Sequence, residues 1–138
     1  MEICFKVKNL PEQSLKQQAR KIFTAFKHEE PVFKESEVNL FFIGSLRMKK
    51  INFLHRKKNK DTDVLSFPMH SPLKKGIFLG DILISKKFLR GNILEKFSLF
   101  FVHGLYHLIG YDHQTDKEYV QMKTKETQLL KKVNIYVD

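Results

Sequence analysis

The sequence predicts a mixed α+β fold, a single domain in which helices pack on a sheet of about four strands. Short apolar segments of strand length alternate with longer segments in which apolar residues recur at helical spacing. The chain has 138 residues, a length that suits one domain with one core. We find no internal repeat, low-complexity tract or linker-like stretch, so we expect residues 1–138 to form one domain.

The first half of the chain is predicted to supply two strands and two helices. Residues 2–7 form a short strand, and Pro11 opens a helix to about residue 26, because proline is favoured in the first helical turn. Residues 38–43 are apolar on both faces and precede a glycine, which indicates a buried strand. Residues 45–54 form a second helix, capped by the serine at its start.

The middle of the chain is predicted to form an antiparallel hairpin after a charged loop at residues 55–63. The first strand covers residues 64–67 and is closed by Pro68, because proline cannot donate a backbone hydrogen bond. Residues 70–76 carry proline and glycine and are predicted to turn. Residues 78–85 form the returning strand.

The last third is predicted to hold two helices after a basic connection at residues 86–92. Residues 93–109 are apolar on nearly every side, and a helix with this pattern is normally buried, so we place it at the centre of the fold. Thr115 or Asp116 can cap a final amphipathic helix that runs to about Val133.

Composition limits the classes of function. The net charge of +10 favours an anionic partner, most often nucleic acid, although surface lysines can also be simply solvated. Cys4 is the single cysteine, so no intrachain disulfide can form, which fits a reducing cytosol. The apolar runs are too short for a membrane span, and the first residues lack a signal peptide's apolar core. We therefore expect a soluble cytoplasmic protein with no membrane partner.

The most informative segment is HGLYHLIGYDH, whose histidines are spaced H-x3-H-x5-H. His103 and His107 lie four residues apart, so on a helix they project from one face. Gly110 favours the end of the helix, and the following turn can bring His113 toward the other two. Three imidazoles would make an open site for a divalent metal, with a position left for water or substrate. Without a metal, histidines on a buried helix need hydrogen-bonding groups of the protein as partners.

The same segment matches H-E-x-x-H-x-x-G-x-x-H, the zinc motif of one class of metalloprotease, except at one position. Gly104 stands where those proteases have the glutamate that deprotonates the attacking water. The segment therefore argues for a metal and, at the same time, against ordinary peptide hydrolysis.

Three separated segments resemble one family, the YbeY-type endoribonucleases or rRNA maturation factors. HGLYHLIGYDH resembles the family signature HGxLHLxGYDH, with Tyr106 in place of the usual leucine. Residues 56–68, RKKNKDTDVLSFP, resemble the family's R-x-K-x-x-x-T-[DN]-VLSFP segment, and residues 79–85, LGDILIS, resemble its LGDI strand. Order and approximate spacing match, and the resemblance covers nearly the whole chain.

The resemblance implies a metal-dependent endoribonuclease that cuts single-stranded RNA, matures the 3′ end of small-subunit rRNA and serves ribosome quality control. It implies one zinc ion on His103, His107 and His113, with nickel as an alternative in the purified protein. It also implies a catalytic basic residue at Arg56. The implied partners are small-subunit rRNA and the ribosome or a ribosomal protein, with a ribosome-assembly GTPase as a further candidate.

The chemistry of phosphoryl transfer indicates a role for each of these residues. The metal on His103 and its partners would polarise a phosphate oxygen or lower the pKa of bound water, and Arg56 would hold the equatorial oxygens. Asp112 either orients a ligand histidine or caps the next helix. Basic residues on both sides of one short helix are candidates for RNA binding. They are Arg47, Lys49, Lys50, Lys57, Lys58 and Lys60.

Two other functions remain open at this point. The chain could be a non-catalytic factor that binds rRNA during ribosome assembly, with a metal that only stabilises its fold. It could also be a metallohydrolase of another kind, although Gly104 disfavours a peptidase. The sequence fixes neither turnover nor a general base.

Overall fold

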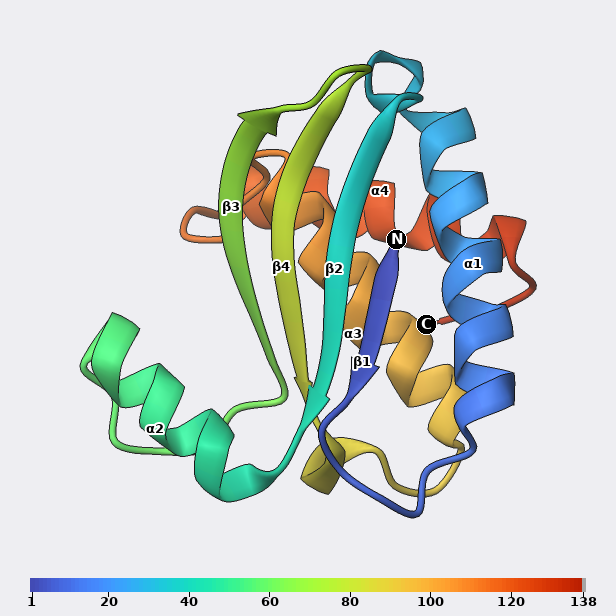
Figure 1. Ribbon diagram of the computed structural model, residues 1–138. Helices are drawn as coiled ribbons and strands as arrows, with labels where there is room; N and C mark the ends of the chain where they lie inside the picture. Colours follow the sequence, from blue (N-terminus) through green and yellow to red (C-terminus); the bar gives the residue numbers. More distant parts are fainter. Residues whose placement is uncertain (138) are drawn as a thin grey trace.

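The sheet is mixed, as predicted, with strand order β1-β2-β4-β3 in a computed structural model that describes residues 1–137 (Figure 1). β1 (Glu2–Phe5) and β2 (Ser36–Ile43) are parallel, and β2 is also parallel to β4 (Ile77–Ser85). β3 (Val64–Pro72) lies at the edge, antiparallel to β4. The predicted hairpin is therefore confirmed, and β2 and β4 are the central strands.

Three helices cover one face of the sheet: α1 (Glu12–Glu29), α3 (Ile93–Leu108) and α4 (Asp116–Lys132) (Figure 1). α2 (Ser45–Arg56) stands apart from them, at the lower left of Figure 1. Short 3₁₀ turns follow α1 and β4, at Pro31–Phe33 and Lys86–Phe88. In the described part of the chain, no helix is long and apolar enough to cross a membrane.

The core has two parts, because successive strand residues point to opposite faces of the sheet. On the larger side, Leu40 and Ile82 are fully buried with Phe101 and Leu105 of α3. Burial of each such side chain contributes roughly 1.5–3 kcal/mol. On the other side a smaller cluster joins α2 to the sheet. It consists of Ile43, Met48, Leu65 and Leu83.

Side-chain caps set the start of both helices that flank the histidine segment. Asn92 accepts a hydrogen bond from the backbone N–H of Glu95 at the start of α3. Thr115 and Glu118 form a reciprocal capping box at the start of α4, so Thr115, not Asp116, is the cap.

β3 is longer than predicted, and the expectations that Pro68 closes it and that residues 70–76 turn are wrong in part. The strand continues to Pro72 through an irregularity between Pro68 and Ser71. Because β3 is an edge strand, proline's missing donor can be tolerated. His70 adopts a left-handed conformation (φ 51°) within that irregularity. The turn proper is confined to residues 73–76.

Other boundaries shift by a few residues. α1 extends to Glu29, and β1 ends at Phe5. Gly44 is the cap of α2, so Ser45 is its first helical residue and not the predicted cap. α2 ends at Arg56, which therefore belongs to the helix and not to the loop predicted for residues 55–63. Asp138, the last residue of the predicted domain, lies outside the described residues.

Candidate active site

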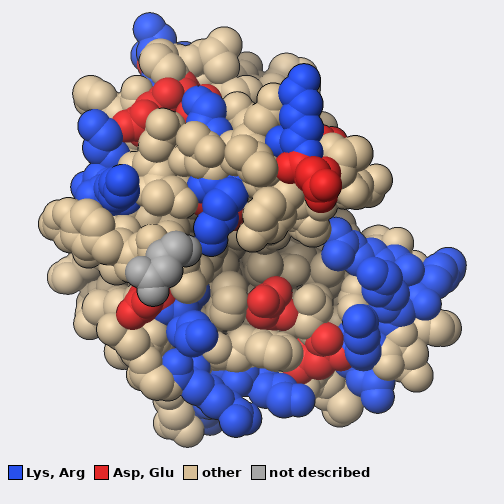
Figure 2. All heavy atoms as spheres, turned by 180° about the vertical axis from the view of Figure 1, so that it is seen from behind, with Lys and Arg blue, Asp and Glu red and all other residues tan. Residues whose placement is uncertain are grey.

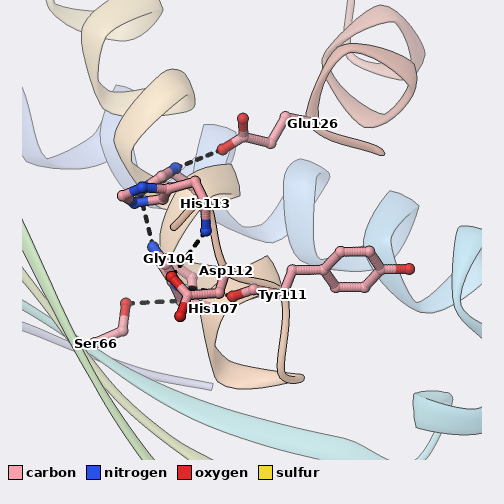
Figure 3. Close-up of polar contacts among 8 residues, drawn as sticks. Ser66, Gly104, His107, Tyr111, Asp112, His113 and Glu126 are labelled. Atoms are coloured by element: carbon pink, nitrogen blue, oxygen red, sulfur yellow. Dashed lines mark hydrogen bonds and ion pairs between the residues drawn. The ribbon is translucent and has the colours of Figure 1, made fainter. Parts of the chain in front are cut away.

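The three histidines converge, as the spacing predicts (Figure 3). His103 and His107 lie on one face of α3, with ring centroids 4.5 Å apart. Gly110 has a φ of +102° beyond the end of the helix, a conformation that favours glycine. The turn places the His113 ring 5.4 Å from that of His103 and 5.1 Å from that of His107. One nitrogen of each ring lies within 4.8 Å of the other two.

Hydrogen bonds determine where the protons of two rings lie. Nδ1 of His107 is 2.9 Å from the carbonyl oxygen of Tyr111, which can only accept, so this nitrogen carries the proton. Nδ1 of His103 is 2.6 Å from a carboxylate oxygen of Glu126 and donates in the same way. In both neutral rings Nε2 is then the nitrogen with the free lone pair.

Those two Nε2 atoms are 3.1 Å apart. Two lone pairs at this distance repel each other unless a proton or a cation lies between them. Burial and, secondarily, the neighbouring His103 lower the pKa of His107, which disfavours a proton on Nε2 of His107 itself. A divalent metal ion removes the conflict, because neutral imidazole is its common ligand. The donor set therefore fits such a metal.

The cluster opens into a cavity of about 610 Å³. Three of the other predicted site residues line it: Arg56, Lys58 and Asp112. The remaining predicted basic residues are exposed on α2 and its loop, outside the lining. They are Arg47, Lys49, Lys50, Lys57 and Lys60. Further lining comes from Thr62, Asp63, Val64, Ser66 and Gln114.

Arg56 reaches this cavity because the loop after α2 is tied back to the helix. Lys57 adopts a left-handed conformation (φ 60°), which ends α2 at Arg56. Nδ2 of Asn52 donates to the carbonyl oxygen of Lys60 at 2.8 Å. The hydroxyl of Ser45 donates to Asp61 at 2.5 Å. Figure 2 shows the result, a group of basic side chains over α2 at the lower right, beside a hollow in which carboxylates are visible.

Of its two predicted roles, Asp112 does not take that of the α4 cap, and it contacts the backbone of His113 but neither nitrogen of that ring. Its carboxylate accepts from the backbone N–H of His113 at 2.8 Å, and Thr115 caps α4. The groups that bond the imidazoles are Glu126 and the Tyr111 carbonyl, which sequence reasoning missed. Glu126 lies on a separate helix, and spacing along the chain carries no signal for it.

Gly104 is required by the packing of α3 on the sheet. A Cβ atom there would lie 2.9 Å from Cγ2 of Ile82 and 3.2 Å from Oγ of Ser66. Its carbonyl oxygen also accepts from the hydroxyl of Ser66 at 3.3 Å. Position 104, where the proteases have glutamate, therefore faces the sheet and is not part of the cavity lining. The geometry of α3, as well as the residue type, argues against a peptidase.

Tyr106, which differs from the family pattern, is buried on the opposite side of α3 and bonded to Glu30, the residue that caps the C-terminal end of α1. Its hydroxyl donates to Glu30 at 3.2 Å, and Lys125 of α4 donates to the same carboxylate oxygen at 3.0 Å. Burial and the charge of Glu30 raise the pKa of Tyr106, so the hydroxyl stays protonated. Its polar group is thus satisfied, and it supports α3 without touching the cavity.

Together these observations define an α+β protein with a cluster of three histidines, suited to a divalent metal, in a cavity with basic side chains at its edge. The chain belongs to the YbeY endoribonuclease family, since the model of that family, described as "Endoribonuclease YbeY", matches residues 2–134.

Individual relatives agree. The Endoribonuclease YbeY of Bartonella bacilliformis is 41% identical over 111 residues, which cover 72% of this chain and 70% of that protein. That of Leptospira interrogans is 40% identical over 121 residues, 70% of this chain and 86% of that protein. A solution structure from Thermotoga maritima has a TM-score of 0.63 at 22% identity, covering 96% of this chain and 87% of the other, and supports the fold.

Proposed function

We propose that this protein is a zinc-dependent endoribonuclease that hydrolyses phosphodiester bonds of single-stranded RNA during maturation of the 3′ end of small-subunit rRNA. Membership of the family supports action on RNA. The observation that carries the metal is the facing pair of Nε2 lone pairs, 3.1 Å apart, on His103 and His107. We further propose a cytoplasmic location, a role in ribosome quality control, and the ribosome, a ribosomal protein or an assembly GTPase as partners.

The proposed ligands are His103, His107 and His113, which leave coordination positions open to the cavity. Three nitrogen ligands with an open position are typical of catalytic zinc, and the same set also accepts nickel. When bound, the metal supplies a Lewis acid for a phosphate oxygen or for water. His103 contributes to catalysis in this sense, as a ligand at the reacting centre.

Arg56 is the proposed phosphate-binding residue. It lines the cavity with the histidines, and its guanidinium can hold two equatorial phosphate oxygens with parallel hydrogen bonds. Charge builds on those oxygens in the transition state, so the bonds strengthen as the reaction proceeds. Asp63 and Asp112, the carboxylates that line the cavity, are the candidate acceptors for the proton of the attacking group.

Glu126 is proposed to be a positioning residue. Its bond to Nδ1 of His103 fixes the tautomer that presents Nε2 to the metal and the orientation of the ring. The Tyr111 carbonyl does the same for His107. The basic group over α2, Arg47, Lys49, Lys50, Lys57, Lys58 and Lys60, would contact phosphates along the RNA strand outside the cavity.

The test is a comparison of zinc-loaded protein and its His103→Ala variant on single-stranded RNA and on a duplex of the same sequence. We expect zinc in equal amount with the wild-type protein, cleavage of the single strand alone, and neither zinc nor cleavage with the variant. Equal cleavage by both proteins would contradict the proposal and point to a contaminating nuclease. Stoichiometric zinc without any cleavage would favour the non-catalytic assembly factor.

A further inference from the structure

A second cavity adjoins the candidate active site between α3 and α4. Its volume is about 260 Å³. It shares Asp63, Val64 and His103 with the larger cavity, so the two form one continuous surface. A strand of RNA with one phosphate at the histidines would therefore extend an adjacent nucleotide over the smaller cavity.

The apolar walls of this cavity suit a flat ring. They come from Leu99 and Phe100 of α3 and Leu130 of α4. Phe100 is half-buried, so part of the side chain stays accessible. Bases of single-stranded RNA are commonly bound by stacking on aromatic side chains. The volume lies below the 300–1,000 Å³ or so of typical pockets for drug-sized ligands, which suits a single base.

Besides the His103 imidazole, the polar groups of the cavity are two carboxylates and one ammonium group: Asp63, Glu126 and Lys123. Glu126 uses one of its two oxygens for His103 (Figure 3). Asp63 uses Oδ1 to accept from the backbone N–H of Val64. Each carboxylate therefore keeps a second oxygen for a ligand that donates, while Lys123 requires a ligand that accepts.

We propose that this cavity, the base pocket, binds the guanine of the nucleotide next to the reacting phosphate, an inference that rests on the proposed function. Guanine carries two adjacent donors, N1–H and the N2 amino group, together with the acceptors O6 and N7. The donors match the free oxygens of Asp63 and Glu126, and the acceptors match Lys123. Adenine and cytosine each offer one amino group, and uracil offers a single ring N–H, so they satisfy the pocket less completely.

The direct test is a titration of ¹⁵N-labelled protein, with and without zinc, by each of the four nucleoside 5′-monophosphates and by inorganic phosphate. Guanosine monophosphate should shift the amide signals of Leu99, Phe100 and Lys123 and bind roughly tenfold more tightly than uridine monophosphate. Inorganic phosphate should leave those signals in place. Equal shifts with all four nucleotides, or no shifts in the pocket, would overturn the proposal.

A matched pair of variants tests the role of the ammonium group. Lys123→Ala should reduce the preference for guanosine over adenosine monophosphate, because O6 of guanine loses its donor, with unchanged zinc content and far-ultraviolet circular dichroism. Lys131→Ala removes the same charge from an exposed residue of α4 outside the pocket and should behave as wild type. If Lys123→Ala retains the full preference for guanine, the role assigned to Lys123 is wrong.

RNA cleavage separates this inference from the proposed function. Oligoribonucleotides with a single guanine at a varied position should be cut at a fixed offset from it by the zinc-loaded protein. Cleavage at positions unrelated to guanine would contradict the base pocket and would leave the proposed nuclease activity intact. Selective binding of guanosine monophosphate in the pocket without cleavage of any RNA would support the base pocket and contradict the proposed nuclease activity.

Discussion

α3 and α2 supply the two halves of the proposed chemistry, and the fold holds them in different ways. α3 buries eight residues, among them Phe101 and Leu105, and lies against the sheet and two other helices. α2 buries two, Met48 and Asn52, and is held by a small apolar cluster and two hydrogen bonds. The proposed metal ligands are therefore fixed by the core, and the proposed phosphate-binding side chains by local contacts.

This difference implies that the two halves can be separated by substitution. A substitution in α2 should weaken RNA binding and cleavage and leave metal binding unchanged. A substitution of one of the three histidines should abolish both metal binding and RNA cleavage.

The largest effect is expected from His107→Ala. The variant loses one of three ligands and leaves His103 without its facing nitrogen, so we expect no stoichiometric zinc and no measurable cleavage. Elemental analysis and an RNA cleavage assay give the readout. His28→Ala, an exposed histidine of α1, is the control and should keep both properties. Zinc retained at full occupancy in His107→Ala would show that the metal lies elsewhere.

Arg56→Lys should give the next largest effect. Lysine keeps the charge but cannot form two parallel hydrogen bonds, so we expect kcat to fall on the order of 10²–10³-fold with unchanged zinc content. Arg47→Lys makes the same exchange on α2 outside the cavity and should change kcat little. Equal kcat for both variants would remove Arg56 from the mechanism.

Glu126→Ala should weaken zinc binding by roughly 10–100-fold, because His103 loses the acceptor that fixes its tautomer. Competition with a chelator measures this in the absence of RNA. Glu126→Gln keeps an acceptor oxygen and should recover part of the affinity. Wild-type affinity in both variants would mean that the contact supports the fold alone.

A smaller effect is expected from Lys58→Ala at the edge of the cavity. Removal of one phosphate contact should reduce the slope of log affinity against log salt concentration by about 1. Filter binding to a fixed oligoribonucleotide at several salt concentrations measures the slope, with Lys21→Ala on α1 as the control. A slope unchanged by Lys58→Ala would place the RNA elsewhere.

The smallest effect is expected from Tyr106→Phe. The variant loses one hydrogen bond, but Glu30 keeps its bond to Lys125, so we expect a loss of about 1 kcal/mol in the free energy of unfolding. Urea denaturation measures it, and zinc affinity should not change. A change in zinc affinity would show that the bond between Tyr106 and Glu30 also helps to position the histidines.

Local signals in the sequence predicted most of this structure, and contacts between distant segments account for what they missed. The spacing of His103, His107 and His113 depends on one helix and one turn, so it could be predicted from the chain itself. β3 extends past Pro68 because it lies at the sheet edge, which depends on strand order. Glu126 meets His103 through the packing of α4 on α3, which no spacing encodes.

Gly104 has a consequence for the evolution of catalysis on this scaffold. Ile82 is branched at Cβ and fully buried, so it cannot easily make room for a longer side chain at position 104. A glutamate there would force α3 outward and carry His103 and His107 with it. A mutational route to a peptidase through Gly104→Glu would thus first lose the alignment of the three histidines.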